Sequence, residues 1–94
     1  METTVVVAEL PMTIGRGRDA TVRLNDAWVS RTHCRLEQEG EKLVVHDLGS
    51  KYGTHVNRHP VMDSKLEPSD ELMVGFTCLW ASLAGGSSSQ ILGT

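Results

Sequence analysis

Three polar clusters in the sequence carry the residue types that bind a small anion. They are Gly15-Arg16, Ser30-Arg31-Thr32-His33 and Gly49-Ser50-Lys51-Tyr52-Gly53-Thr54. An arginine can donate two hydrogen bonds to one oxyanion, a hydroxyl adds a directional donor, and backbone amides in glycine turns can point at an anion. A phosphate monoester requires these groups together. The clusters therefore predict a phosphate-binding site, provided that the fold brings them to one place.

Catalysis by these residues is the less favoured interpretation. His33 and Cys34 are neighbours on an expected strand, so their side chains should point to opposite faces and form no catalytic pair. The segment 49–54 lacks the Gly-Lys-Ser/Thr end of a nucleotide-binding P-loop. We therefore expect no enzymatic activity. An esterase-like enzyme built on Ser30 and His33 is the last of the alternatives.

No metal or cofactor is expected. Pro60 and the strand pattern argue against a helix that would place His55 and His59 on one face, and no other close ligand pair occurs. The histidines and cysteines that could in principle bind zinc are His33, His46, His55, His59, Cys34 and Cys78. Neither cysteine belongs to a Cys-x-x-Cys pair, so both are expected to be reduced core residues.

Short alternating apolar runs separated by turn formers indicate β-strands, and helix is hard to place. The expected strands cover residues 4–10, 12–16, 21–24, 33–39, 42–47, 54–56, 60–62, 71–74 and 77–83. Val22 and Leu24 should face inward with Arg23 outward, and Trp80 fits the core pattern of the last strand. Many short strands at this spacing predict an all-β fold, a sandwich or a barrel. In a sandwich the loops gather at two ends, so the three clusters can meet on one rim.

The composition bounds the kind of protein. A chain of 94 residues suits one domain, and we expect that domain to cover residues 1–84, with the Gly/Ser-rich residues 85–94 as a flexible tail or linker. No apolar run is long enough to span a bilayer, and the first ten residues lack the basic start of a signal peptide. We expect a cytoplasmic protein, or a nuclear one if the source is eukaryotic, with no membrane partner.

The charge distribution also indicates which class of partner the protein binds. The net charge is −3, yet residues 15–58 hold eight basic and six acidic side chains. A mildly acidic protein with a local group of arginines suits one compact anion better than the long charge array of a nucleic acid duplex. We therefore expect no nucleic-acid partner.

In order and spacing, the clusters resemble the forkhead-associated (FHA) domain family. The matching segments are Ile14-Gly15-Arg16, then Val29-Ser30-Arg31-Thr32-His33, then residues 47–57, and finally Asp70-Glu71-Leu72 with Gly75. The spacings fit without gaps from Gly15 to Asn57. The resemblance implies an antiparallel, FHA/SMAD-like β-sandwich whose binding loops lie at one end and bind phosphothreonine peptides.

The resemblance also implies roles for five binding residues. Arg16 matches the arginine that pairs with the phosphate, and Ser30 matches the hydroxyl that hydrogen-bonds it. Arg31 matches a residue that contacts the phosphate or the peptide backbone. Lys51 matches the position that meets the phosphothreonine, and Tyr52 the position that holds the peptide main chain.

Four further positions match loop-scaffold residues of the family: Gly15, His33, Gly53 and Asn57. The ring of His33 is expected to tie the loop that carries Ser30 to its neighbour. One departure concerns Tyr52, because the family usually has asparagine there, so the amide that would grip the peptide backbone is absent. Trp28, in the loop before Ser30, could shelter a bound peptide.

The expected function is a phosphothreonine-binding interaction module in kinase-dependent signalling, monomeric as an isolated domain. The alternative is a phosphate-independent structural or assembly module that uses the same sandwich.

Overall fold

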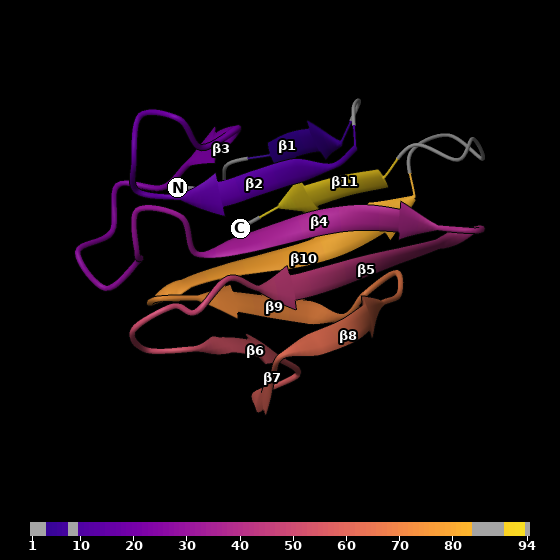
Figure 1. The fold of residues 1–94 in the computed structure, drawn as a ribbon. Helices are drawn as coiled ribbons and strands as arrows, with labels where there is room; N and C mark the ends of the chain where they lie inside the picture. The colour runs from indigo at the N-terminus through magenta and orange to yellow at the C-terminus, as the bar shows by residue number, and fades with distance from the viewer. Residues whose placement is uncertain (1–3, 8–9, 84–89, 94) are drawn as a thin grey trace.

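The computed structural model describes residues 4–7, 10–83 and 90–93. These residues contain eleven strands (Figure 1). In chain order they are β1 (Thr4–Val7), β2 (Met12–Gly15), β3 (Val22–Arg23), β4 (Cys34–Glu39), β5 (Lys42–Asp47), β6 (Thr54–Val56), β7 (His59–Val61), β8 (Asp63–Leu66), β9 (Glu71–Val74), β10 (Thr77–Leu83) and β11 (Gln90–Gly93).

Two sheets face each other across a single apolar core. One has the strand order β1-β11-β10-β9-β6-β7 and the other β3-β2-β4-β5-β8. Neighbouring strands are antiparallel except β2 and β3, which run parallel. The predicted all-β sandwich is therefore confirmed.

The core is built from the inward side chains of both sheets. Ile14, Leu36 and Val45 of one sheet and Leu72 and Val74 of the other are completely buried. They belong to one continuous cluster of buried apolar residues. Burial of each such side chain contributes about 1.5–3 kcal/mol relative to exposure. This packing makes the sandwich a rigid base for the loops at its ends.

Two strands differ from the sequence prediction. β8 was not predicted, because Leu66 is its one buried apolar residue and the strand lies at a sheet edge beside β5. Residues 90–93 were predicted to lie in a tail, yet they form β11, which pairs with both β1 and β10. Main-chain pairing supplies this strand's order without an apolar alternation that sequence reasoning could detect. The predicted linker at residues 85–89 lies outside the described residues.

The inward face of β10 is also different from the prediction. Leu79 is buried, whereas Trp80 is 41% exposed, so the placement of Trp80 in the core was wrong. Alternation along the strand explains this, because consecutive side chains point to opposite faces. Cys34 is fully buried as expected, but Cys78 is only partly buried, and both are free thiols.

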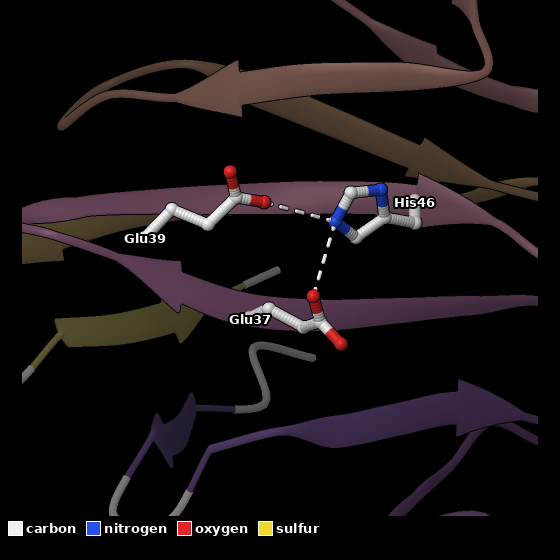
Figure 2. A group of neighbouring side chains, drawn as sticks. All are labelled: Glu37, Glu39 and His46. Atoms are coloured by element: carbon white, nitrogen blue, oxygen red, sulfur yellow. Dashed lines mark hydrogen bonds and ion pairs between the residues drawn. The ribbon is translucent and has the colours of Figure 1, made fainter.

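A charged cluster lies on the outer face of the five-stranded sheet (Figure 2). His46 Nε2 lies 3.3 Å from a carboxylate oxygen of Glu37 and 3.3 Å from one of Glu39. Its other ring nitrogen, Nδ1, contacts the carboxylate of Asp63 on β8. The cluster therefore joins β4, β5 and β8 across two strand pairs.

The neighbouring carboxylates favour a proton on His46. The hydrogen bond to Asp63 raises the pKa of His46 above its ordinary value; burial opposes this, and the carboxylates of Glu39 and Glu37 add to it. The ligand atoms of Glu37, Glu39 and His46 lie within 4.8 Å of one another, close enough for a divalent cation. With His46 protonated, its contacts with Glu37, Glu39 and Asp63 are ion pairs, and we interpret the cluster as an ion-pair network.

The stability contribution of His46 should decrease as the pH rises. Because the folded-state pKa is raised, the contribution is complete below the unfolded-state pKa of about 6.5 and is lost as pH rises through the folded-state value. His46→Gln should therefore lower the melting temperature more at about pH 6 than at about pH 9. Thermal unfolding at the two pH values measures this. His59→Gln is the control, since His59 is exposed and forms no ion pair with the described residues. An equal loss at both pH values for His46→Gln would contradict the assignment.

Candidate functional site

The three polar clusters meet at one end of the sandwich, on the left of Figure 1. Arg16 follows β2, Ser30 lies before β4, and Lys51 lies between β5 and β6. The amide of Arg16 donates to the Ser30 carbonyl over 2.9 Å, and the amide of Lys51 donates to the Ser30 hydroxyl over 3.0 Å. Ser30 thus connects the other two loops directly. We call this end the apical rim.

His33 fixes the loop of Ser30 from beneath. It is completely buried just before β4, and its Nδ1 accepts a hydrogen bond of 3.0 Å from the Ser30 amide. A backbone amide can only donate, so the proton of the neutral ring is on Nε2, which donates to the Gly53 carbonyl over 2.8 Å. One imidazole therefore joins the second cluster to the third. Arg35 and Glu37, which follow His33 at alternate positions, are only partly buried.

These contacts leave no catalytic base at Ser30. Both ring nitrogens of His33 bind backbone groups, so neither can accept a proton from the Ser30 hydroxyl. Burial, with the nearby charge of Asp47, raises the pKa of Cys34 to about 12, so this thiol remains protonated near neutral pH. The geometry therefore argues against the esterase alternative.

Two glycines allow the close approach of these loops. A Cβ at Gly15 would lie 2.0 Å from the Arg31 carbonyl oxygen, so no larger residue fits without moving backbone. Gly53 has φ +86°, a conformation that side chains other than hydrogen disfavour. Next to the hydrogen bond between Arg16 and Ser30, the Gly17 amide donates to the Arg31 carbonyl over 3.0 Å.

Asp47 organises the turn before Lys51, although it was not among the predicted site residues. Its carboxylate accepts hydrogen bonds from the amides of Gly49 and Ser50 and from the hydroxyls of Ser50 and Thr54. Burial alone would raise the pKa of Asp47, but these hydrogen bonds outweigh it and lower the pKa. The signal was present in the sequence, since an aspartate two residues before a glycine commonly forms an Asx turn.

Asn57 lies at the other end of β6, away from the apical rim. It occupies the tight β6–β7 turn, where Asn57 and Arg58 both have positive φ. Its side-chain amide donates to Asp70, and its side-chain oxygen accepts from the Glu71 amide. Asn57 therefore attaches the β6–β7 hairpin to the start of β9, and no hydrogen bond among the described residues connects it to Ser30 or His33.

The polar groups of the rim can donate to an anion. Arg16 is exposed, and its Nε donates to the Val29 carbonyl over 3.0 Å, which leaves its terminal N–H groups for a ligand. The Ser30 hydroxyl accepts from Lys51 and still has its own hydrogen to donate. Arg31 and Lys51 are exposed beside them.

An aromatic cluster forms the other part of the rim, and the sequence pattern did not reveal it. The ring centroids of Trp28 and Tyr52 are 4.7 Å apart and those of Trp28 and Phe76 are 5.3 Å apart, both edge to face. All three rings are exposed, and the Lys51 ammonium lies 5.3 Å from the Tyr52 ring centroid. Edge-to-face pairs are favourable beyond the area they bury.

Asp26 holds this aromatic cluster in place. Its carboxylate accepts hydrogen bonds from the amides of Trp28 and Phe76 and from the Thr77 hydroxyl. Burial alone would raise the pKa of Asp26, but these hydrogen bonds lower it. The contact joins residues 50 positions apart in the chain. Local sequence patterns do not contain such information.

Within the described residues, no helix has the length and apolar character needed to cross a membrane.

Comparison with known families and proteins agrees with this geometry. The family model for the FHA domain matches residues 12–75. A glycogen accumulation regulator, GarA, of Mycolicibacterium smegmatis is 43% identical over 61 residues, and an oxoglutarate dehydrogenase inhibitor of Corynebacterium jeikeium is 41% identical over 61 residues. Each match covers 65% of this chain but only 39% and 42%, respectively, of the relative. The chain therefore corresponds to less than half of these proteins.

Two solved structures have the same fold over nearly the whole chain. The FHA domain of FhaA, complexed with the intracellular domain of Rv3910, has a TM-score of 0.69 and 29% identity and covers 100% of both chains. A structure from an analysis of phosphothreonine-dependent FHA domain interactions also has a TM-score of 0.69 and 29% identity, covering 98% of this chain and 93% of that one.

Replacement of His33 should loosen the apical rim. His33→Ala leaves a cavity and removes the partners of the Ser30 amide and the Gly53 carbonyl, so we expect a loss of about 2–4 kcal/mol in the free energy of unfolding. Urea unfolding measures this change. His59→Ala is the control, because His59 is exposed on an edge strand and should change stability by less than about 0.5 kcal/mol. Equal effects of the two variants would contradict the role of His33.

Proposed function

The chain belongs to the forkhead-associated family, and on this premise we propose that its apical rim binds phosphorylated threonine in a partner protein. One observation carries the proposal. Ser30 lies where the loops of Arg16 and Lys51 meet, because its carbonyl accepts from the Arg16 amide and its hydroxyl accepts from the Lys51 amide. An arginine, a hydroxyl and a lysine are thus held beside one another on a rigid base.

The proposed mechanism is charge-assisted hydrogen bonding to a phosphate dianion. A phosphoryl group near neutral pH carries a charge of about −1.5 to −2 and three strong acceptor oxygens. Arg16 would donate its terminal N–H groups, Ser30 its hydroxyl hydrogen, and Arg31 and Lys51 would add positive charge. Because His33 and Asp47 already hold the backbone, little ordering entropy remains to be lost on binding.

The proposed module binds and does not catalyse. Its activity would be to recruit a protein that a kinase has phosphorylated to the complex in which this domain takes part. A cytoplasmic location, a monomeric state and the absence of a nucleic-acid partner belong to the same proposal. The FhaA domain complexed with an intracellular protein domain supports a protein as the partner.

A second candidate function is favoured by the aromatic cluster. Trp28, Tyr52 and Phe76 are 45%, 47% and 72% exposed, which is a large apolar surface to leave in water. Such a surface could hold a folded partner without phosphate, as an assembly module would. Binding to an unphosphorylated partner that is lost in Trp28→Ala but retained in Arg16→Ala would favour this function over phosphate recognition.

Phosphate dependence is the direct test of the proposal. A phosphothreonine peptide should bind, and its unphosphorylated twin should not, because the charge-assisted hydrogen bonds require the dianion. Arg16→Ala should weaken binding roughly tenfold or more, the loss of about 1.5–3 kcal/mol expected for a hydrogen bond to a charged group. Isothermal titration measures both effects.

Arg58→Ala is the matched control, since Arg58 is exposed and pairs with Glu71 at the other end of β6. It should leave the affinity unchanged. Equal affinity for the phosphorylated and unphosphorylated peptides would end the phosphate-reading proposal.

Tyr52→Asn tests how the rim holds the peptide main chain. An asparagine amide can both donate to and accept from an extended peptide, whereas the Tyr52 ring packs against Trp28 and offers one hydroxyl. We expect Tyr52→Asn to strengthen binding to a generic phosphothreonine peptide by about 0.5–1.5 kcal/mol. Tyr52→Ala removes the ring without adding an amide and should show no such gain. If the two variants bind alike in titration, Tyr52 does not face the peptide main chain.

A further inference from the structure

A basic hollow adjoins Arg16, and none of the three aromatic residues of the rim lines it. It has a volume of about 480 Å³ and lies between the β2–β3 loop and the segment after Ser30. Its lining residues are Arg16, Gly17, Arg18, Asp19, Arg23, Arg31 and Thr32. Four of these seven residues are arginines, so the hollow concentrates positive charge in a protein whose net charge is −3.

The four arginines have no carboxylate partner among the described residues. The two remaining arginines of the chain do have one: Arg35 lies 2.7 Å from Glu37, and Arg58 lies 3.6 Å from Glu71. Asp19 contributes the one carboxylate of the hollow but forms no ion pair with the arginines. The positive charge of the hollow is therefore not neutralised within the described part of the chain.

Backbone contacts hold two of the guanidinium groups. Arg23 Nε donates to the Arg16 carbonyl over 3.1 Å, and Arg16 Nε donates to the Val29 carbonyl over 3.0 Å. Each contact uses one donor of five and leaves the terminal N–H groups for a ligand. A guanidinium that is already positioned loses less conformational entropy when it binds an oxyanion.

A single phosphate does not neutralise this hollow. Four arginines and one aspartate leave three positive charges, and a phosphoryl group supplies about −1.5 to −2. The proposed phosphothreonine contacts use Arg16 and Arg31. Arg18 and Arg23 remain beside them with no assigned ligand.

We propose that Arg18 and Arg23 form a second anion subsite, which binds another acidic group of the same partner segment. The ligand is an oxyanion, either the carboxylate of an aspartate or glutamate or a second phosphate. This inference rests on the proposed function, because the phosphothreonine places the second group in the hollow. The subsite makes the domain selective for acidic or multiply phosphorylated segments.

A peptide series with the full chain tests the subsite. The reference peptide has one phosphothreonine and neutral flanking residues. In the other peptides, a single glutamate or a second phosphothreonine replaces each flanking position in turn. For at least one position we expect affinity about tenfold above the reference at low salt, as for one added charge-assisted contact, and a smaller gain at high salt.

Three variants identify the residues responsible. Arg18→Gln should remove most of the gain and leave the reference affinity within about twofold, because Arg18 has no hydrogen bond within the described structure that its loss could disturb. Arg23→Gln should act in the same direction, and Arg58→Gln should retain the full gain. A gain from glutamate, from phosphate or from both supports the subsite, and the larger gain identifies its preferred anion.

Other results overturn the inference in distinguishable ways. If the reference peptide binds and no second anion improves its affinity, the subsite does not exist, while the proposed function stands. If a gain persists undiminished in both Arg18→Gln and Arg23→Gln, the second anion binds elsewhere. If the reference peptide itself does not bind, the proposed function fails and the subsite fails with it.

Discussion

The apical rim depends on one buried imidazole. His33 accepts from the Ser30 amide and donates to the carbonyl of Gly53, twenty positions further along the chain, so a single neutral ring joins two loops. An unpaired buried amide or carbonyl costs about 1–3 kcal/mol, which makes any arrangement that separates these loops unfavourable. Ser30 in turn holds the two neighbouring loops, because its hydroxyl accepts from the Lys51 amide and its carbonyl accepts from the Arg16 amide. The positions of the binding groups on the rim thus depend on His33, which is itself completely buried.

Two partly buried carboxylates, those of Asp47 and Asp26, also fix loops of the rim by hydrogen bonding. Asp47 gathers the amides and hydroxyls of the turn that leads to Lys51, and Asp26 joins the loop of Trp28 to the β9–β10 turn. Both carboxylates replace water by several fixed donors, and in both the hydrogen bonds outweigh the cost of burial and lower the pKa. The rim is therefore ordered by contacts to side chains as well as by the strands beneath it.

Local sequence patterns predicted the features that depend on strand alternation and turn residues. The sandwich and the polar clusters of Arg16, Ser30 and Lys51 could be found from alternation, turn residues and spacing, and the FHA family match agrees with the resemblance. β11 could not be predicted, because its order comes from pairing with strands distant in the sequence. The same limit hid the contact of Asp26 with Phe76 and the meeting of Arg18, Arg23 and Arg31 in one hollow, since tertiary packing alone brings these residues together.

The rim presents two unlike groups of side chains. One is the hollow that contains Arg16, Arg18, Arg23 and Arg31, which have no carboxylate partner among the described residues, and the other is the exposed rings of Trp28, Tyr52 and Phe76. The residues that flank a phosphothreonine bound at Ser30 would meet charge at one group and apolar surface at the other. The phosphate contacts alone would accept any phosphothreonine, so discrimination among partners has to come from these flanks. A segment with both acidic and apolar residues beside the phosphothreonine would complement both groups, whereas basic residues there would be repelled by the arginines.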